Sequence, residues 1–378
     1  MAMHKKTGLI LTGGGARAAY QVGVLKAVDE LLGHPQENPF SILCGTSAGA
    51  INAAALAIHA GDFTESVRRL IAVWEGFRCD QVYRADWPGI ARTGARWVST
   101  LLFSARTNPV SLLDNSPLRE MLERTMAFDR IQANIDAGAL HAVAVTASGY
   151  TSGQSVTFYQ GGSGLEQWER TQRVGAATAL NAELLLASSA LPFIFPAVKV
   201  HREFFGDGSM RQMAPISPAL HLGADRVLVL GTGRQSTEPP RVRAHLYPSL
   251  AQVAGHALNS IFLDSLAVDI ERLERINRTL ACVPPDSARE AGLKLRPIDV
   301  LVMHPSQPLE RVAARHVQHF PRPVRFLLRT VGAMNRNGSN LASYLLFEAP
   351  FCRALIDLGY HDAIVRRDEM LAFLDRGA

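Results

Sequence analysis

The stretch Phe40-Ser41-Ile42-Leu43-Cys44-Gly45-Thr46-Ser47-Ala48-Gly49 decides the fold of this 378-residue chain. Its first half, residues 40–44, is an apolar run typical of a buried strand, and residues 50–58 form an alanine-rich run with high helix propensity. A strand, the pattern G-x-S-x-G and a helix make the layout of a nucleophile elbow, whose tight turn exposes the serine hydroxyl. Gly45 and Gly49 permit the strained turn and the close passage of strand and helix. Ser47 is therefore the candidate nucleophile.

A second glycine motif, Gly13-Gly14-Gly15-Ala16-Arg17, follows a predicted strand at residues 7–11. A helix is expected from about residue 18 to 32, with Gly33 as its stop. Glycines between a strand and a helix expose backbone N–H groups at the positive end of the helix dipole, where an anion binds. The anion is a phosphate or a transient oxyanion. A phosphate loop is disfavoured because no Gly-Lys-Ser/Thr follows, and a glycine-rich turn without a ligand is the remaining alternative.

The third motif is Phe204-Phe205-Gly206-Asp207-Gly208-Ser209, in which an apolar strand end leads into an acidic residue between two glycines. On its own, such a stretch is most often a structural Asx turn. Next to a serine elbow and an anion-binding loop, Asp207 becomes the candidate base that accepts the serine proton, with Gly208 forming the turn after it.

In this order, the three motifs resemble those of the patatin-like phospholipase family. That family pairs a G-G-G-x-R/K-G oxyanion loop with a G-x-S-x-G serine and a later D-G-G/A aspartate. The Ser/Ala-rich segment 187–196, which ends in Pro196, is similar to the segment that precedes the family's aspartate. The resemblance covers about residues 5–232. Ala18 stands where the family has glycine, and Ser209 where it has glycine or alanine; both are small residues, so the departures concern fine geometry.

The resemblance implies a lipid acyl hydrolase, such as a phospholipase A, a lysophospholipase or an esterase, that forms an acyl-enzyme on Ser47. Asp207 would accept the serine proton, and a carboxylate with a reference pKa of about 3.9 does so only if burial or an aligned hydrogen bond assists it. Arg17 would add charge to the oxyanion site or anchor its loop. The implied oxyanion hole consists of Gly13, Gly14, Gly15, Arg17 and Ala48.

Two other functions are open at this point. A Ser-His-Asp hydrolase or acyltransferase would need a positioned histidine, and His141, His201 and His221 lie at predicted strand or turn positions outside any motif. In α/β-hydrolases the nucleophile strand follows several others, whereas Ser47 follows about the second strand, which disfavours this function. A non-catalytic patatin-shaped scaffold that binds lipid or a protein partner is the other alternative, and the intact motifs argue against it.

Composition favours a soluble globular protein, with 47% hydrophobic and 19% charged residues. The net charge of +5 is expected to reflect a solvated surface, and no nucleic-acid partner is expected. No targeting segment and no apolar run of about 18 residues is present, so we expect membrane contact only at the surface. The cysteines show no metal spacing and no close pairs, which predicts a cytoplasmic protein without a metal or organic cofactor. They are Cys44, Cys79, Cys282 and Cys352.

Strands alternating with helices predict an α/β layered fold with a mostly parallel central sheet flanked by helices. We expect a catalytic domain at residues 5–233, an Arg- and Pro-rich linker at 234–247, and a mostly helical C-terminal extension at 248–378. The extension begins with a long helical pattern over 249–280. Further strands are predicted at 141–147, 155–159, 198–205 (as a hairpin), 226–230 and 298–303, and further helices at 63–77, 115–126 and 181–189.

Segment 78–106 has a different character, because basic and aromatic side chains are interleaved in it. Such side chains lie at lipid headgroup boundaries, where the aromatic rings insert and the arginines pair with phosphates. The functional interpretation is an inserted lid that contacts a membrane surface; the alternative is a packed surface excursion with solvated arginines. The side chains concerned are Arg78, Arg84, Arg92, Arg96 and Arg106 with Tyr83, Trp87, Trp97 and Phe103.

Overall fold

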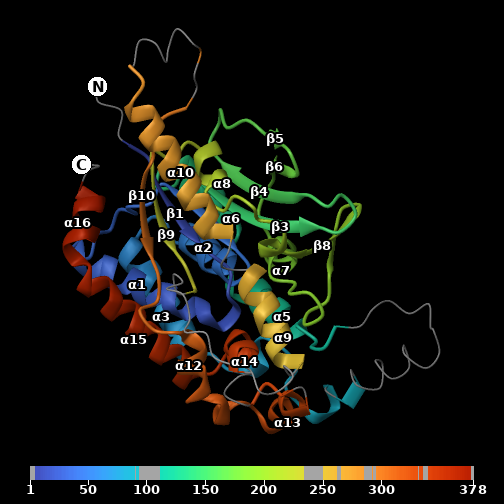
Figure 1. The fold of residues 1–378 in the computed structure, drawn as a ribbon. Helices are drawn as coiled ribbons and strands as arrows, with labels where there is room; N and C mark the ends of the chain where they lie inside the picture. Colours follow the sequence, from blue (N-terminus) through green and yellow to red (C-terminus); the bar gives the residue numbers. More distant parts are fainter. Residues whose placement is uncertain are drawn as a thin grey trace.

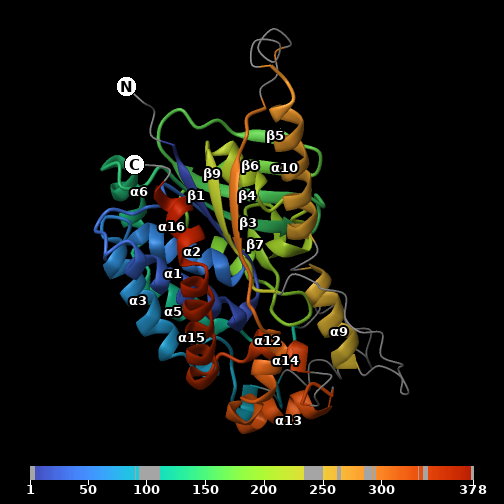
Figure 2. The same ribbon diagram turned by 60° about the vertical axis from the view of Figure 1, so that its left-hand side comes forward.

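The computed structural model describes residues 5–89, 91–92, 111–233, 250–261, 265–284, 292, 295–330, 332–334 and 339–375. Within these residues, one ten-stranded sheet lies between two layers of helices (Figures 1 and 2). Its main path is β10-β9-β1-β2-β3-β4-β6-β5, and the β7–β8 hairpin joins it at β3. The strands are β1 (Thr7–Leu11), β2 (Ile42–Thr46), β3 (Ala142–Gly149), β4 (Ser155–Gly161), β5 (Trp168–Arg170), β6 (Arg173–Ala177), β7 (Val198–Val200), β8 (Glu203–Asp207), β9 (Arg226–Leu230) and β10 (Asp299–Met303).

Five neighbouring strands, β10, β9, β1, β2 and β3, run parallel, and the antiparallel pairings lie on one side of them. Successive residues of each parallel strand face opposite layers: Leu9 and Leu11 pack into one core, and Ile10 packs into the other. Because both faces are buried, these strands appear in the sequence as continuous apolar runs. The predicted α/β fold with a mostly parallel central sheet is confirmed.

The two helical layers differ in size. The larger covers one face with α1 (Ala19–Leu31), α2 (Ala48–Ile58), α3 (Phe63–Glu75), α6 (Asp129–Asp136) and α15 (Ala349–Val365), and α16 (Arg367–Asp375) follows it. The other face is covered by α8 (Ser217–His221) and α10 (Ser265–Ala281). The remaining helices are α5 (Ser116–Thr125), α7 (Ala182–Ser188), α9 (Leu250–Asn259), α12 (Leu309–Ala314), α13 (Arg322–Thr330) and α14 (Ser339–Leu345). Short 3₁₀ turns occur at Gly15–Ala18 (η1), Cys79–Gln81 (η2), Gly208–Met210 (η3) and Val317–His319 (η5).

Local sequence patterns predict the bounds of most helices and strands to within a few residues. Strands 7–11 and 226–230 have the predicted bounds, and α5 begins at Ser116 with Pro117 in its first turn. The β2 strand starts later than predicted and includes Gly45, because the turn begins only at Ser47. The helical pattern predicted over 249–280 corresponds to α9, which lies beside α14, and α10, which packs against the sheet; residues 262–264 between them lie outside the described residues. Both halves favour helix, but they bury their apolar faces against different neighbours.

The C-terminal region completes the layers formed by the preceding part of the chain. Strand β10 extends the parallel sheet at β9, and α15 packs along α1. That packing requires glycine on both helices, because a Cβ at Gly23 would collide with the Ile356 backbone and one at Gly359 with the Tyr20 backbone. The boundary at residue 233 stays a prediction, and the predicted linker 234–247 lies outside the described residues.

The predicted lid is described only in part, since residue 90 and residues 93–106 lie outside the described residues. Tyr83 does not belong to a lipid-facing surface, because it is buried and its hydroxyl donates a hydrogen bond of 2.8 Å to the Leu345 carbonyl. Trp87, in contrast, is 54% exposed. Among the described residues, no helix is long and apolar enough to cross a bilayer.

Candidate active site

Ser47 occupies a strained turn between β2 and α2. Its φ of 56° and ψ of −129° fall in a region that L-residues rarely adopt, and such strain is concentrated at functional sites. The turn is held by Ser188, whose hydroxyl accepts a hydrogen bond of 2.8 Å from the Ser47 N–H and donates one of 2.6 Å to the Thr146 carbonyl. The Ser47 hydroxyl is thereby presented at the start of α2, as the motif predicted.

The two flanking glycines are required by close packing. A Cβ at Gly45 would collide with the Gly49 carbonyl, and a Cβ at Gly49 would collide with the Leu11 carbonyl at the end of β1. The start of α2 therefore lies directly against the loop that follows β1. This contact brings the serine elbow and the glycine loop together.

Asp207 reaches Ser47 through their shared neighbour, β3. Strand β2 pairs with β3 in parallel, with Thr46 opposite Thr146, while β8 pairs with β3 in antiparallel, with Asp207 opposite Ala147. The carboxyl ends of β2 and β8 thus meet at adjacent positions of one strand. Gly208 is needed there, because a Cβ would collide with the Thr146 carbonyl.

The Asp207 carboxyl is only 1% exposed. Its Oδ1 accepts a hydrogen bond of 2.9 Å from the Ser209 N–H, while Oδ2 has no aligned partner among the described residues. Burial raises the pKa of Asp207 to about 6, against the opposing effect of the nearby Ser47 hydroxyl and the Ser209 groups. A carboxyl with this pKa and a free oxygen beside a serine is suited to accept a proton near neutral pH.

The raised pKa of Asp207 predicts opposite pH dependences for activity and stability. Because only the ionised carboxylate accepts a proton, kcat/KM is expected to rise with pH and to reach half its maximum near the carboxyl pKa of about 6. Between about pH 4 and pH 6 the unfolded chain releases the Asp207 proton while the folded chain keeps it. The free energy of unfolding should therefore fall by up to about 3 kcal/mol as the pH rises through this window.

A pH–rate profile and urea unfolding across about pH 4 to 8 measure both effects. Asp207→Asn keeps the buried site neutral and should remove this part of the stability change, whereas Asp114→Asn, at an exposed position, should retain it. A stability that rises between about pH 4 and 6 by the same amount in wild type and Asp207→Asn would contradict the assignment.

The glycine loop lies beside Ser47 with unengaged backbone donors. Among the described residues, no acceptor takes the N–H groups of Gly13, Gly14 or Gly15. Gly15 has a φ of 56°, and a Cβ on it would collide with the Tyr344 carbonyl. Gly15 and Ala48 line the same cavity as Ser47, whereas Gly13, Gly14 and Arg17 do not. The arrangement can offer N–H groups to an anion that forms next to the serine.

Arg17 points away from Ser47 into the C-terminal helices. Its guanidinium lies 3.9 Å from the centre of the Tyr344 ring. Its nitrogens donate to the Ser343 hydroxyl at 2.8 Å, the Tyr344 hydroxyl at 3.1 Å and the side-chain oxygen Oδ1 of Asn259 at 3.2 Å, and also to Oδ1 of Asn340. Among the described residues no carboxylate pairs with it. Of the two predicted roles, these contacts favour the anchor and place the guanidinium outside the immediate oxyanion site.

An apolar cavity of about 360 Å³ extends from Ser47. It follows α2 from Ala48 at one end to Ile58 and His59 at the other, and is walled by α3, α5 and the end of α14. Asp207 does not line it and lies behind the serine. Its apolar walls include Ile51, Leu70, Trp74, Leu118, Leu122, Phe195 and Phe347. A long hydrocarbon group attached at the serine would fit this space.

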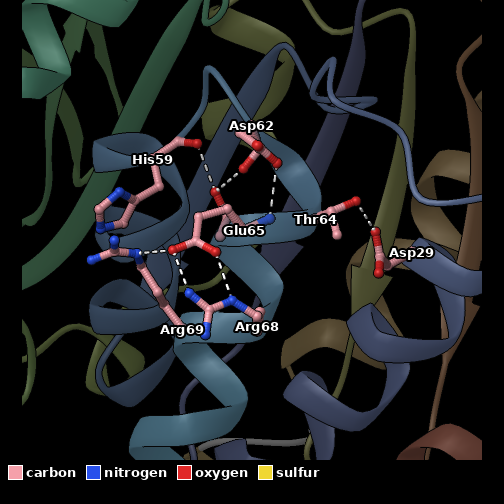
Figure 3. A network of polar contacts seen from close by, with 8 residues as sticks. Asp29, His59, Asp62, Thr64, Glu65, Arg68 and Arg69 are labelled. Atoms are coloured by element: carbon pink, nitrogen blue, oxygen red, sulfur yellow. Dashed lines mark hydrogen bonds and ion pairs between the residues drawn. The ribbon is translucent and has the colours of Figure 1, made fainter.

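The far end of the cavity is polar and reaches the surface. Figure 3 shows Glu65 of α3 between Arg68 and Arg69, with His59 at the end of α2. Nε of Arg68 and Nε of Arg69 each donate a hydrogen bond of 2.6 Å to Glu65, and the bonds from Arg68 and Arg69 lower the Glu65 pKa to about 2. Asp62 caps α3 through a 2.9 Å bond from the Glu65 N–H. The arginines are therefore largely engaged by Glu65.

The three histidines considered for a triad lie away from the site. His201 is exposed in the β7–β8 turn, His141 has its Nε2 3.1 Å from the Lys6 amine, and His221 stacks on Trp168 with ring centroids 4.7 Å apart. Among the described residues, no histidine hydrogen-bonds to Ser47 or Asp207. The geometry gives no support to a Ser-His-Asp arrangement.

Three parts of the site escaped sequence reasoning. Ser188 was within the predicted Ser/Ala-rich segment, but nothing identified it as the residue that fixes the elbow. The cavity walls on α3 and α5 appeared only as ordinary amphipathic helices. The partners of Arg17 lie more than 240 positions away in the chain, and no local pattern indicated them.

This chain is similar to several known proteins. A family model described as Patatin-like phospholipase matches residues 9–220, more than half of the chain. A cGAMP-activated phospholipase of Pseudomonas aeruginosa is 27% identical over 221 residues, which are 56% of this chain and 55% of that protein. A cUMP-AMP-activated phospholipase of Escherichia coli is 44% identical over 71 residues, 17% of this chain and 22% of that protein. This chain thus spans about half the length of the first relative and about a fifth of the second. The solved structure of VipD from Legionella pneumophila covers 97% of this chain and 67% of its own, with 13% identity and a TM-score of 0.37.

Proposed function

Because this chain belongs to the patatin-like phospholipase family, we propose that it hydrolyses carboxylic esters of lipids with Ser47 as nucleophile and Asp207 as base. The observation that carries the proposal is the position of a strained, presented serine beside a buried carboxyl, at one end of an apolar cavity. The acyl chain occupies the cavity, and the alcohol part of the ester leaves on the other side of the serine.

The reaction proceeds in two stages. The Ser47 oxygen attacks the ester carbonyl carbon while its proton passes to Asp207, and the carbonyl oxygen becomes an oxyanion. The N–H groups of Gly14, Gly15 and Ala48 stabilise that charge, with Gly13 and Arg17 holding the loop. The carbon–oxygen bond to the alcohol then breaks, and the alcohol takes the proton from Asp207. Water, deprotonated by Asp207, then attacks the acyl carbon; the bond to the Ser47 oxygen breaks, and Asp207 returns the proton to that oxygen as the fatty acid leaves.

The cavity suggests the length of acyl chain that is preferred. It runs along the eleven residues of α2, a distance of roughly 16 Å. An extended carbon chain advances about 1.2 Å per bond, so about 12 to 14 carbons fill this length. Longer chains would have to pass the polar end at Arg68 and Arg69.

The proposal is tested by fatty acid release from p-nitrophenyl esters of increasing chain length and from phospholipid vesicles. Activity is expected to increase from short chains to a maximum near 12 to 14 carbons. Separate samples contain cGAMP or cUMP-AMP, since the names of the two relatives specify these activators. Hydrolysis that Ser47→Ala abolishes supports the proposal. Silence of the wild type on every ester, with and without either nucleotide, would favour the non-catalytic scaffold instead.

We further propose that the described part of segment 78–106 contributes to membrane-surface contact through Trp87 and Arg92. Both side chains are exposed, as an interfacial position requires. We also propose that residues 5–233 form a catalytic domain and residues 248–378 a helical extension. In this division, the extension anchors the glycine loop through its contacts with Arg17.

A further inference from the structure

The net charge of the chain is concentrated in one short stretch. Residues 311–330 contain five arginines and two histidines and no acidic residue. The whole chain has 39 basic and 34 acidic side chains, so without these five arginines it would hold 34 of each. The stretch therefore accounts for the entire formal charge of +5. Its arginines are Arg311, Arg315, Arg322, Arg325 and Arg329.

This stretch lies on the surface, from the end of α12 through η5 to α13. All of the arginines except the half-buried Arg325 are exposed. Among the described residues, none of the five forms an ion pair with a carboxylate; Arg325 donates a hydrogen bond of 3.1 Å to the Gln318 carbonyl. Glu310 precedes the stretch without neutralising it. The charges are thus free to attract an anionic partner.

Helix α13 also presents an aromatic side chain among these charges. Val324 and Leu328 of α13 are buried in the core, while Phe326 is 58% exposed. Arg322 precedes Phe326 by four positions and Arg329 follows it by three, so both lie on the same helical face. The ring of Phe326 packs 5.9 Å from the ring of Trp87, which is itself more than half exposed. Two exposed rings are therefore bordered by arginines.

We propose that this surface, formed by residues 311–330 and Trp87, docks the protein onto anionic phospholipid bilayers. Aromatic rings insert at the headgroup level and arginines pair with lipid phosphates, and each basic residue near an anionic leaflet adds about 1 kcal/mol. The rings of Trp87 and Phe326 pack on one another among these arginines, and aromatic rings beside basic side chains are what an interfacial position requires.

The position of the docking surface indicates how the protein would approach its lipid substrate. This part of the inference rests on the proposed function. Figures 1 and 2 show α13 beside α12 and α14, at the end of the molecule that holds the glycine loop contact with Tyr344. Val82, five positions before Trp87, lines the cavity, as does Leu345 of α14. Docking through α13 would bring this end of the protein to the lipid from which the acyl chain is drawn.

Sedimentation with vesicles of phosphatidylcholine alone, or of phosphatidylcholine and phosphatidylglycerol at about 3:2, tests the proposal. The wild type is expected to bind the anionic vesicles and to be released by salt. Arg322→Glu/Arg329→Glu should lower the partition coefficient roughly 30-fold or more, since each arginine contributes a factor of about five. The matched control Arg275→Glu/Arg278→Glu makes the same charge change on exposed positions of α10, far from α13 in both views, and should bind nearly as the wild type does.

A second variant, Trp87→Ser/Phe326→Ser, removes the rings without changing charge and should lower binding about tenfold or more. Hydrolysis of soluble p-nitrophenyl butyrate should stay within about twofold of wild type in every variant, because none touches the serine site. The binding and hydrolysis assays together separate the two proposals. Vesicle binding without ester hydrolysis would contradict the enzymatic proposal and leave the docking proposal intact. Equal binding to both vesicle types, equal loss in the α10 control, or tighter binding to single-stranded RNA than to vesicles would overturn the docking proposal.

Discussion

Ser47→Ala is expected to reduce kcat/KM for lipid esters by at least about 10⁴-fold while leaving the fold intact. The loss is this large because the acyl-enzyme cannot form without the Ser47 oxygen. The fold should survive because the Ser47 hydroxyl caps nothing; the turn is held instead by the Ser47 backbone N–H on Ser188. Steady-state hydrolysis and circular dichroism measure the two effects.

Asp207→Asn should reduce kcat/KM by about 10³ to 10⁴-fold, because the amide cannot accept the serine proton. In the double variant Ser47→Ala/Asp207→Asn, the loss should be no greater than in Ser47→Ala alone, since the two groups act as one unit. Additive losses would mean that Asp207 acts independently of the serine. His201→Ala should retain activity. If this variant folded but were inactive, the result would point to a Ser-His-Asp triad.

Ser189→Ala is the matched control for the nucleophile. Ser189 also lines the cavity and is buried, but its hydroxyl has no partner among the described residues. Removing a hydroxyl without a partner should leave activity within about threefold and should not lower stability. If Ser189→Ala lost activity as completely as Ser47→Ala, the assignment of the nucleophile would fail.

Gly15→Ala is expected to lower kcat about 10² to 10³-fold with little change in KM. Gly15 has a positive φ, and the added methyl group would meet the Tyr344 carbonyl, so the loop must shift away from the serine. Such a shift misplaces N–H donors that are needed only once the oxyanion forms, which reduces kcat more than substrate binding. The free energy of unfolding should also fall, through backbone strain and the displaced contact.

Gly33→Ala provides the control for backbone strain. Gly33 has a φ of 71° at the end of α1, and a Cβ there meets nothing within 4 Å. It should cost about 1 kcal/mol of stability and leave kcat unchanged. Comparable kcat values for Gly15→Ala and wild type would show that the glycine loop is not part of the oxyanion site.

Elements with a local cause follow from the amino-acid sequence alone. Apolar runs gave β1 and β9, the Gly33 stop gave the end of α1, and Pro117 marked the start of α5. The three motifs indicate the serine, the glycine loop and the aspartate, because a strained turn tolerates few residue types. The order of these motifs in the chain is enough to indicate the family.

The way in which distant residues combine depends on the tertiary fold. The side-chain partners of Arg17 come from α9 and α14, and the raised pKa of Asp207 depends on burial by several elements. Likewise, the walls of the cavity come from α2, α3, α5 and α14 together. Trp87 lies beside Phe326 of the basic stretch 311–330 only in the folded protein. Periodicity and propensity act over a few turns of chain, whereas these features arise from contacts between segments far apart in sequence.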